Sequence, residues 1–314
     1  MSFATKLINR HFSTGIKLSN KNVIIKNVTV IGGGIMGGGI AQVAAQTGHN
    51  VTLVDVSEDV LKNSKSKIET SLARVVKKLF GDNKEKGELF QKETMGRLNY
   101  RTSLVDSVNE ADLVVEAVVE NIDIKHKVFT QLDSVAPEHT IFASNTSSFL
   151  IKDMAKVTKR LDRFGGLHFF NPVTVMKLVE VIKMPETSQE THEALIKFGT
   201  TMGKTAVEAK DKDGFIVNRL LIPYLMDSVR MLERGDATAR DIDTAMKLGS
   251  GHPMGPIELV DYIGLDTCKF ALDGWHQKEP NNPTYRPIAM LDKLVSEGKL
   301  GVKTGAGFYE YKKK

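Results

Sequence analysis

A histidine in a strand-like run is the first candidate for chemistry. His168 lies in Gly165–Pro172, which is typical of a strand that ends in an abrupt turn. An imidazole titrates near neutrality, so it can accept the proton of a hydroxyl group during an oxidation. The carboxyl end of a strand is also where doubly wound sheets bind ligands. By composition alone, however, a histidine between Leu167 and Phe169 is more often a satisfied core residue, so its surroundings must decide.

A carboxylate interrupts the next apolar run. Glu180 lies within Leu178–Ile182, where an ionised carboxylate needs a partner or a strong compensating field. If that partner is His168, the pair fixes the imidazole tautomer and stabilises the imidazolium formed on proton transfer, as the acid does in a catalytic triad. The alternative is a glutamate on an edge strand that faces water, and the sequence alone leaves both interpretations open.

A glycine-rich turn predicts a place for a phosphate group. Gly32, Gly34 and Gly37 follow a strand-like run in the spacing G-x-G-x-x-G. The first glycine permits a tight turn, the second lets the backbone approach a pyrophosphate, and the third lets a helix pack closely on the strand. A plain packing turn is the alternative. Asp55 ends the next strand-like run, however, where a carboxylate accepts hydrogen bonds from an adenosine ribose. This order of features favours a dinucleotide.

The same acid selects between two dinucleotides. Asp55 would repel a 2′-phosphate, and Val56 and Ser57 stand where a neutralising arginine is expected for NADP. The predicted cofactor is therefore NAD. The residues expected to contact it in this part of the chain are Gly32, Gly33, Gly34, Ile35, Met36, Gly37 and Asp55.

A long amphipathic helix is predicted after Asp55. Ser57 can cap its N-terminus, and Glu58 and Asp59 suit the positive end of the helix dipole. Its apolar face consists of Leu61, Ile68, Leu72, Val75 and Leu79. The polar turn 81–87 lets a second helix return, which makes an inserted helical hairpin. The opposite stripe, either an anion-binding face or a solvated one, consists of Lys67, Ser71, Arg74 and Lys78.

Strand-like and helix-like runs alternate up to about residue 210. A strand over 28–31, a helix over 34–47 and a strand over 51–54 form a βαβ unit. Further strand-like runs are 113–119, 140–143, 167–170, 177–182 and 206–209, and helical patterns follow over 215–233, 239–248 and 256–272. We expect an α/β protein with a Rossmann-type doubly wound, mostly parallel sheet, followed by an all-α C-terminal domain. The expected division is 1–22, a leader; 23–210, the NAD-binding domain; and 211–314, the helical domain.

Charge and hydropathy exclude two classes of partner. Of the 43 basic residues four lie in residues 1–22, which leaves 39 against 38 acidic ones. A nearly neutral body lacks the basic footprint that nucleic-acid binding requires. The uncharged stretch 27–54 is long enough to span a membrane, but the six glycines within residues 32–39 disfavour a continuous helix. We therefore expect neither nucleic acid nor a membrane span.

The first 22 residues have the composition of a mitochondrial transit peptide. They combine apolar, basic and hydroxyl side chains and contain no carboxylate. The alternative is a frayed N-terminus. A lone Cys268 permits no internal disulfide, which suits a reducing compartment such as the mitochondrial matrix, the predicted location.

Several motifs, in order, resemble the mitochondrial L-3-hydroxyacyl-CoA dehydrogenase family. They are the glycine turn, Ser144–Ser148, His168–Pro172, Met176–Val181, Asp213–Arg219 and Gly251–Pro256. The resemblance covers essentially everything after the leader. It implies NAD-dependent oxidation of L-3-hydroxyacyl-CoA to 3-oxoacyl-CoA in fatty-acid β-oxidation, with a homodimer formed by the helical domain.

The resemblance also implies residue roles. His168 is then the general base and Glu180 its orienting carboxylate, while Ser147 and Asn218 form hydrogen bonds around the substrate oxygen and the thioester carbonyl. The further cofactor contacts that it implies are Glu120, Lys125, Ser147 and Asn171. The coenzyme A contacts are Ser71 and Lys78, with Ser147 also facing substrate, and no metal is expected.

Three other functions share part of this set of motifs. A 3-hydroxybutyryl-CoA dehydrogenase has a similar motif set. A gulonate dehydrogenase shares the fold without coenzyme A, and the residues Ser71 and Lys78 argue against it. An inactive NAD-binding structural protein is the third, and the joint presence of His168, Glu180, Ser147 and Asn218 argues against it, because a structural role needs none of them.

Overall fold

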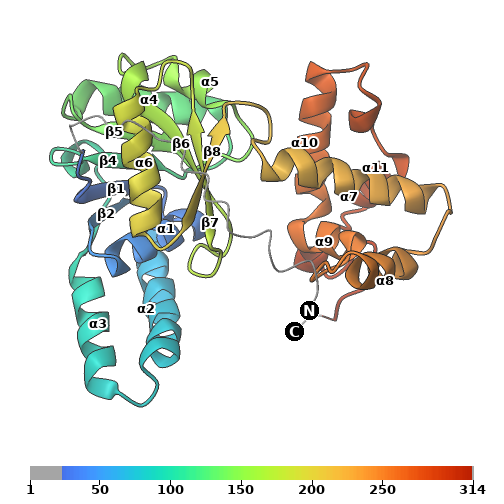
Figure 1. Ribbon diagram of the computed structural model, residues 1–314, viewed down its shortest axis with the longest axis horizontal. Helices are drawn as coiled ribbons and strands as arrows, with labels where there is room; N and C mark the ends of the chain where they lie inside the picture. The colour runs from blue at the N-terminus through green and yellow to red at the C-terminus, as the bar shows by residue number, and fades with distance from the viewer. Residues whose placement is uncertain (1–22, 313–314) are drawn as a thin grey trace, which may run out of the picture.

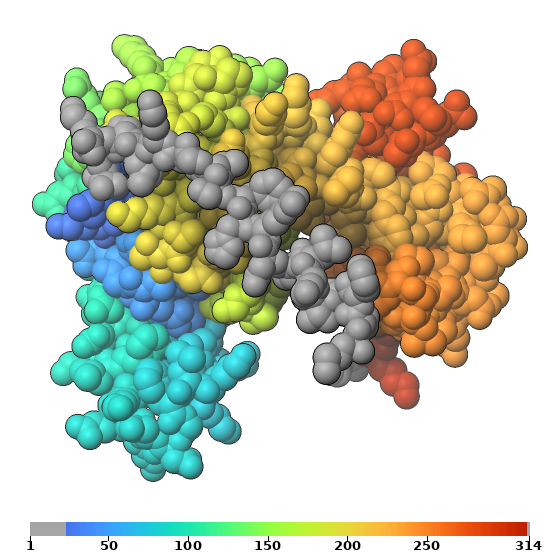
Figure 2. Space-filling model, viewed as in Figure 1, coloured from blue at the N-terminus to red at the C-terminus, as the bar shows by residue number. Residues whose placement is uncertain are grey.

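The computed structural model describes residues 23–312 and shows a sheet domain, a projecting helical hairpin and a helical C-terminal domain (Figure 1). The space-filling view shows the hairpin and the helical domain as separate lobes on two sides of the sheet domain (Figure 2). The predicted fold class is confirmed.

Eight strands form one sheet in the order β3-β2-β1-β4-β5-β6-β7-β8. The strands are β1 (Asn27–Ile31), β2 (Asn50–Val54), β3 (Leu98–Arg101), β4 (Leu113–Glu116), β5 (Ile141–Ser144), β6 (Phe164–Phe169), β7 (Leu178–Lys183) and β8 (Thr205–Lys210). The first six strands run parallel, β7 is antiparallel to β6, and β8 is parallel to β7. The last two strands therefore run against the others.

Helices cover the two faces of this sheet. They are α1 (Ile35–Gln46), α2 (Glu58–Phe80), α3 (Lys84–Gly96), α4 (Ile122–Val135), α5 (Ile151–Ala155) and α6 (Gln189–Thr201). On one face α1, α2 and α6 bury Ile40, Ile68 and Phe198 against the strands. On the other face α4 and α5 bury Phe129 and Met154.

The predicted βαβ unit is confirmed, but β3 was missed. Leu98–Arg101 is short and only Leu98 is buried, so no apolar run marks it as a strand. The segment 256–272, predicted as one helical stretch, breaks at Gly264, whose φ of 106° suits glycine and ends a helix. The directions of β7 and β8 also lie beyond what apolar runs can indicate.

The helical hairpin begins as predicted but is less buried than its pattern suggests. The Ser57 side chain accepts a hydrogen bond from the Val60 N–H, which caps α2. The turn is shorter than the predicted 81–87, because Asn83 caps α3, which already begins at Lys84. Leu72 is fully buried, whereas Leu79 is 62% exposed. The far half of α2 therefore lacks the sheet domain beneath it and lies beside α3 alone.

The C-terminal domain packs five helices around a separate core. They are α7 (Val217–Glu233), α8 (Ala239–Gly249), α9 (Pro256–Ile263), α10 (Leu265–Lys278) and α11 (Ala289–Ser296). Leu225, Val260 and Leu291 are fully buried in this core. None of the helices within residues 23–312 is long and apolar enough to cross a membrane.

Candidate active site

A histidine and a glutamate meet where β6 and β7 pair. The antiparallel register places His168 directly opposite Glu180, so both side chains leave the same face of the sheet. The His168 Nδ1 lies 2.7 Å from the Glu180 Oε2, and the two residues are 5% and 0% exposed. The alternative of an edge-strand glutamate in water is therefore wrong.

The second oxygen of Glu180 holds the start of the C-terminal domain. Its Oε1 accepts hydrogen bonds from the backbone N–H groups of Ile216 at 3.0 Å and Val217 at 2.9 Å. These groups belong to the N-terminus of α7, where N–H donors lack partners within the helix and the dipole favours an anion. The buried carboxylate is thus satisfied by an imidazole and two amides, and no lysine or arginine within residues 23–312 pairs with it.

This arrangement defines which nitrogen of His168 can act as a base. A carboxylate only accepts hydrogen bonds, so Nδ1 must carry a proton to bind Glu180. The neutral imidazole then has Nε2 as its proton acceptor. The rings of Phe170 and Phe215 lie 4.5 and 5.6 Å from the imidazole centroid and limit its rotation. The histidine is therefore oriented from three sides.

Asn218 and Ser147 lie on two different elements, each of which is connected to this pair through neighbouring residues. Asn218 follows Val217 in the first turn of α7, so its backbone is fixed by the same Glu180 contact. Ser147 lies in the loop after β5, and its N–H donates to Glu120 at 3.2 Å. In the same loop the Asn145 Oδ1 accepts from the Phe169 N–H at 2.9 Å, which ties the loop to the residue after His168. Sequence analysis assigned Asn145 no role.

The glycine turn has the geometry of a pyrophosphate cradle. Gly32 has a φ of 109°, and a Cβ there would lie 2.4 Å from the Ala117 carbonyl oxygen. A Cβ on Gly37 would lie 1.8 Å from the Gly32 oxygen, so both positions need glycine for packing. A Cβ on Gly34, by contrast, would meet no atom within 4 Å. This residue precedes α1, whose first turn contains no acidic side chain, and its backbone is therefore open to an anion.

Asp55 contacts this turn directly. One carboxylate oxygen accepts from the Gly33 N–H at 2.8 Å, and the other accepts from the Ser57 N–H at 3.1 Å. Each oxygen retains lone-pair capacity for a ribose hydroxyl. Beside it Ile35 is 69% exposed, so this end of α1 presents an open surface to a ligand.

A second buried carboxylate lies at the end of β4, and sequence analysis missed it. Glu116 is 0% exposed, and it accepts from the Lys125 ammonium at 2.6 Å and the Val118 N–H at 2.8 Å. Lys125 is 1% exposed, and its Nζ lies 3.7 Å from Glu120. The signal was present, because Glu116 stands in an apolar run as Glu180 does. These contacts hold Glu120 and Lys125 together beside the strand ends.

A groove joins the glycine turn to the hairpin. It has a volume of about 280 Å³, and Gly34, Ser71 and Asn171 are among the residues that line it. Lys67 also lines it, whereas Lys78 does not. Lys78 lies seven residues beyond Ser71 on α2, about 10 Å further along the helix axis. The structure thus places Ser71 and Asn171 beside the glycine turn, whereas Lys78 lies closer to the tip of the hairpin.

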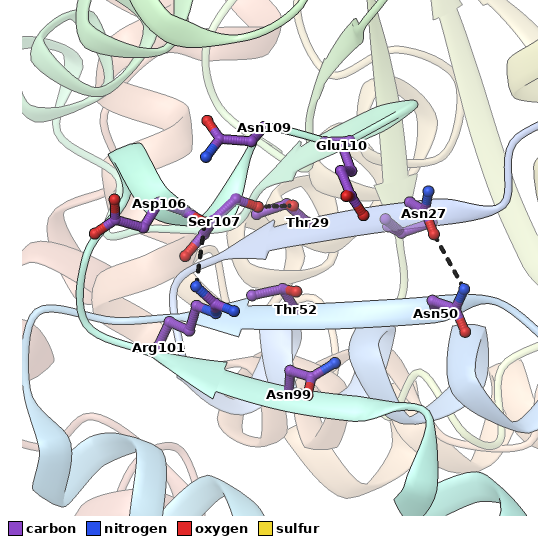
Figure 3. A pocket seen from close by; sticks show the side chains of 12 residues that line it. Asn27, Thr29, Asn50, Thr52, Asn99, Arg101, Asp106, Ser107, Asn109 and Glu110 are labelled. Atoms are coloured by element: carbon purple, nitrogen blue, oxygen red, sulfur yellow. Dashed lines mark hydrogen bonds between the residues drawn. The ribbon is translucent and has the colours of Figure 1, made fainter.

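A polar hollow on the other sheet face has a structural explanation. Figure 3 shows Asn27, Thr29, Asn50, Thr52 and Asn99 along β1, β2 and β3. The connection from β3 to β4 contains only the single 3-10 turn Val105–Ser107 instead of a covering helix. Asn50 and Asn99 are exposed and Asn27 and Thr52 are partly exposed, so these side chains are accordingly polar, whereas the buried Thr29 donates a hydrogen bond to the Ser107 carbonyl at 2.7 Å. None of the predicted site residues lines this hollow.

The family of the chain follows from comparison with known domains. A family model described as the 3-hydroxyacyl-CoA dehydrogenase NAD binding domain matches residues 27–212, and one described as the C-terminal domain matches residues 214–311. The chain belongs to the 3-hydroxyacyl-CoA dehydrogenase family. The predicted resemblance, the enzyme class and the NAD cofactor are thereby confirmed, while the roles of single residues stay predictions.

Relatives of this family match nearly the whole chain. The chain is 56% identical over 314 residues to the mitochondrial hydroxyacyl-coenzyme A dehydrogenase of Sus scrofa, covering 99% of this chain and 100% of that one. It is 43% identical over 293 residues to a probable 3-hydroxybutyryl-CoA dehydrogenase of Bacillus subtilis, covering 92% and 99%. The solved structure of (S)-3-hydroxybutyryl-CoA dehydrogenase from Ralstonia eutropha matches with a TM-score of 0.87 at 40% identity, covering 92% and 100%.

The geometry of the glycine turn predicts different effects when Gly34 and Gly32 are each replaced by alanine. Gly34→Ala should leave the free energy of unfolding nearly unchanged but raise the dissociation constant of NADH about tenfold, because the methyl group occupies the approach of the pyrophosphate. Gly32→Ala should lower the free energy of unfolding by more than about 1 kcal/mol, because its φ and its contact with Ala117 both exclude a side chain. NADH fluorescence titration and urea unfolding measure the two effects.

A matched control is Gly274→Ala, another position where a Cβ meets open space. It should change neither NADH binding nor the fold. Unchanged NADH affinity in Gly34→Ala would contradict the cradle assignment.

Proposed function

We propose that the protein oxidises L-3-hydroxyacyl-CoA to 3-oxoacyl-CoA with NAD, in fatty-acid β-oxidation, with His168 as general base. The observation that carries this proposal is the buried contact of 2.7 Å between His168 Nδ1 and Glu180 Oε2, which leaves Nε2 as the proton acceptor. Alcohol oxidation requires such a base beside the carbon that loses hydride.

The residues divide the chemistry as follows. NAD, when bound, accepts the hydride. His168 takes the hydroxyl proton on Nε2, and Glu180 stabilises the imidazolium that results. Asn218 and Ser147 donate hydrogen bonds to the substrate oxygen and the thioester carbonyl, which orients the carbon that reacts. In the reverse direction the same imidazolium returns the proton.

The cofactor site in this proposal follows the ends of the parallel strands. The glycine turn binds the pyrophosphate and Asp55 the adenosine ribose. Glu120, Ser147 and Asn171 contact the remainder of the cofactor. Lys125 supports this set from within the protein, because its ammonium bridges Glu116 and Glu120.

The coenzyme A site in this proposal lies on the hairpin. Ser71 lines the groove beside the glycine turn, and the exposed Lys78 further along α2 offers a cation to the phosphates of coenzyme A. The alternative of a purely solvated stripe predicts no effect of Lys78 on substrate binding.

Location and assembly are part of the proposal. We propose the mitochondrial matrix, supported by relatives that carry mitochondrial names. The predicted transit peptide, 1–22, lies outside the described residues.

We also propose domains at 23–210 and 211–314 and a homodimer that forms through the second domain. Exposed apolar side chains in that domain support the homodimer, among them Leu220, Leu248 and Phe270.

The direct experiment follows NADH consumption at 340 nm with acetoacetyl-CoA as substrate. Turnover with NADH and much weaker turnover with NADPH are expected, because Asp55 repels a 2′-phosphate. A series of 3-oxoacyl-CoA chain lengths then defines the preferred substrate. A protein that binds NADH but reduces none of these thioesters would contradict the proposed function.

Substitution of the proposed base should lower kcat more than substitution of its carboxylate partner. His168→Gln should lower kcat at least about 10²-fold with NADH affinity preserved, because the proton acceptor is lost. Glu180→Gln should lower kcat less, by about tenfold, because its amide can present a donor to Nδ1 and favour the wrong tautomer. Steady-state kinetics measures both effects.

The chain offers a matched pair for comparison. His192 and Glu208 form a similar contact at 2.8 Å between α6 and β8, and Glu208→Gln should leave kcat unchanged. Near-wild-type turnover in Glu180→Gln would mean that Glu180 only supports the fold.

If Lys78 binds the phosphates of coenzyme A, its removal should change the Michaelis constants of two substrates differently. Lys78→Ala should raise the Michaelis constant for acetoacetyl-CoA several-fold and leave that for the N-acetylcysteamine thioester unchanged, because only the former carries the nucleotide phosphates. Lys77→Ala removes the adjacent charge, off the proposed stripe, and should affect neither. Equal losses with both substrates in Lys78→Ala would show an effect through structure instead.

A further inference from the structure

One wall of the cofactor groove is the loop between β6 and β7. Asn171 and Val173 of this loop line the groove together with Gly33 and Gly34. Val173 is 3% exposed and packs on α1, where a Cβ added to Gly39 would lie 3.0 Å from the Val173 Cβ. The position of Asn171 therefore depends on how this loop is held against α1.

A lysine from another part of the sheet supports the loop from within. Lys204 lies between α6 and β8, is 9% exposed, and donates from its Nζ to the backbone carbonyls of Val173 and, at 2.7 Å, Met176. Within residues 23–312 it forms no ion pair with a carboxylate. Burial lowers the pKa of its ammonium, and the nearby cation of Lys177 lowers it further.

This environment is unusual for a lysine whose role is only to pack. A buried ammonium is costly unless its protons are bound, and here the bound partners are two loop carbonyls in place of an anion. Those carbonyls, in turn, have this cation as their common donor. If the loop moved away, the buried ammonium would lose its hydrogen-bond acceptors, and if the lysine moved away, the two carbonyls would lose their donor. The loop and the start of β8 are therefore held together through one side chain.

We propose that Lys204 is a positioning residue, which fixes the loop 171–176 against α1 and thereby keeps Asn171 in place for NAD. The proposal rests on the proposed function in one respect, the assignment of Asn171 to the cofactor. Lys204 itself does not line the groove, so its removal should weaken dinucleotide binding through the loop, and more than turnover.

The test is Lys204→Met, which keeps the length and volume of the side chain and removes its donors. The dissociation constant of NADH, measured by fluorescence titration, should rise about tenfold, while kcat at saturating NADH stays within threefold of the wild type. Lys204→Arg restores donors to both carbonyls and should bind NADH within threefold of the wild type. Lys210→Met makes the same change at the exposed far end of β8 and should alter nothing.

A second measurement separates loop positioning from general support of the fold. The N–H groups of Val175 and Met176 both donate to the Pro172 carbonyl at 2.9 Å, so their hydrogen exchange reports the order of the loop. In Lys204→Met, exchange should accelerate at least tenfold in the peptide 170–177 and remain unchanged in α6 and β8. If this variant does not fold, Lys204→Leu, which also lacks a donor, is measured against the same limits.

Two results would overturn the proposal. One is an NADH dissociation constant less than threefold above that of the wild type. The other is faster exchange spread equally over α6 and β8, which would make Lys204 a structural residue. NADH binding does not require the proposed substrate, so a wild-type protein inactive on acetoacetyl-CoA would contradict the proposed function and leave this test intact.

Discussion

The buried carboxylate of Glu180 is the contact on which the rest of the site depends. It accepts three hydrogen bonds, one from His168 and two from the backbone at the start of α7. A fully buried carboxylate is tolerated only when its oxygens are satisfied, and in the part of the chain that the structure describes no lysine or arginine contributes to that. The strand pair β6–β7 and the first turn of α7 must therefore take up their positions together, because displacing either one leaves the buried carboxylate without part of its hydrogen bonds.

This requirement accounts for several features that otherwise look unrelated. The reversal of β7 brings Glu180 opposite His168, and a register slip of one residue would move Glu180 to the other face of the sheet. β8 runs parallel to β7, and only residues 211–216 separate it from α7. Asn218 then follows one residue after the second amide that binds Glu180. The proposed site is thus assembled around one side chain, which contacts both the strand pair and the start of α7.

Local patterns predicted the parts of this site that are local. The glycine turn, Asp55 and the cap at Ser57 depend on a few adjacent residues, and the structure places them as expected. The contact of His168 with Glu180 remained one of two alternatives, because it depends on the direction of β7, which no apolar run encodes. Lys204 was missed for a similar reason, because its two partners lie at least 28 residues away in the sequence. Glu116 was missed although it stands in an apolar run as Glu180 does. Contacts between residues far apart in the sequence decide which buried charges are satisfied, and the periodicity of apolar residues does not predict these contacts.

The tautomer of His168 tests the central claim most directly. Selective ¹⁵N labelling of the eight histidines, with assignment by comparison with His168→Gln, resolves which ring nitrogen carries the proton in the neutral state. Hydrogen bonding to Glu180 predicts that Nδ1 is protonated and Nε2 is the free acceptor, and that Glu180→Gln disturbs this preference. A neutral His168 with its proton on Nε2 in the wild-type protein would contradict the account, because the nitrogen proposed to act as the base would already be occupied.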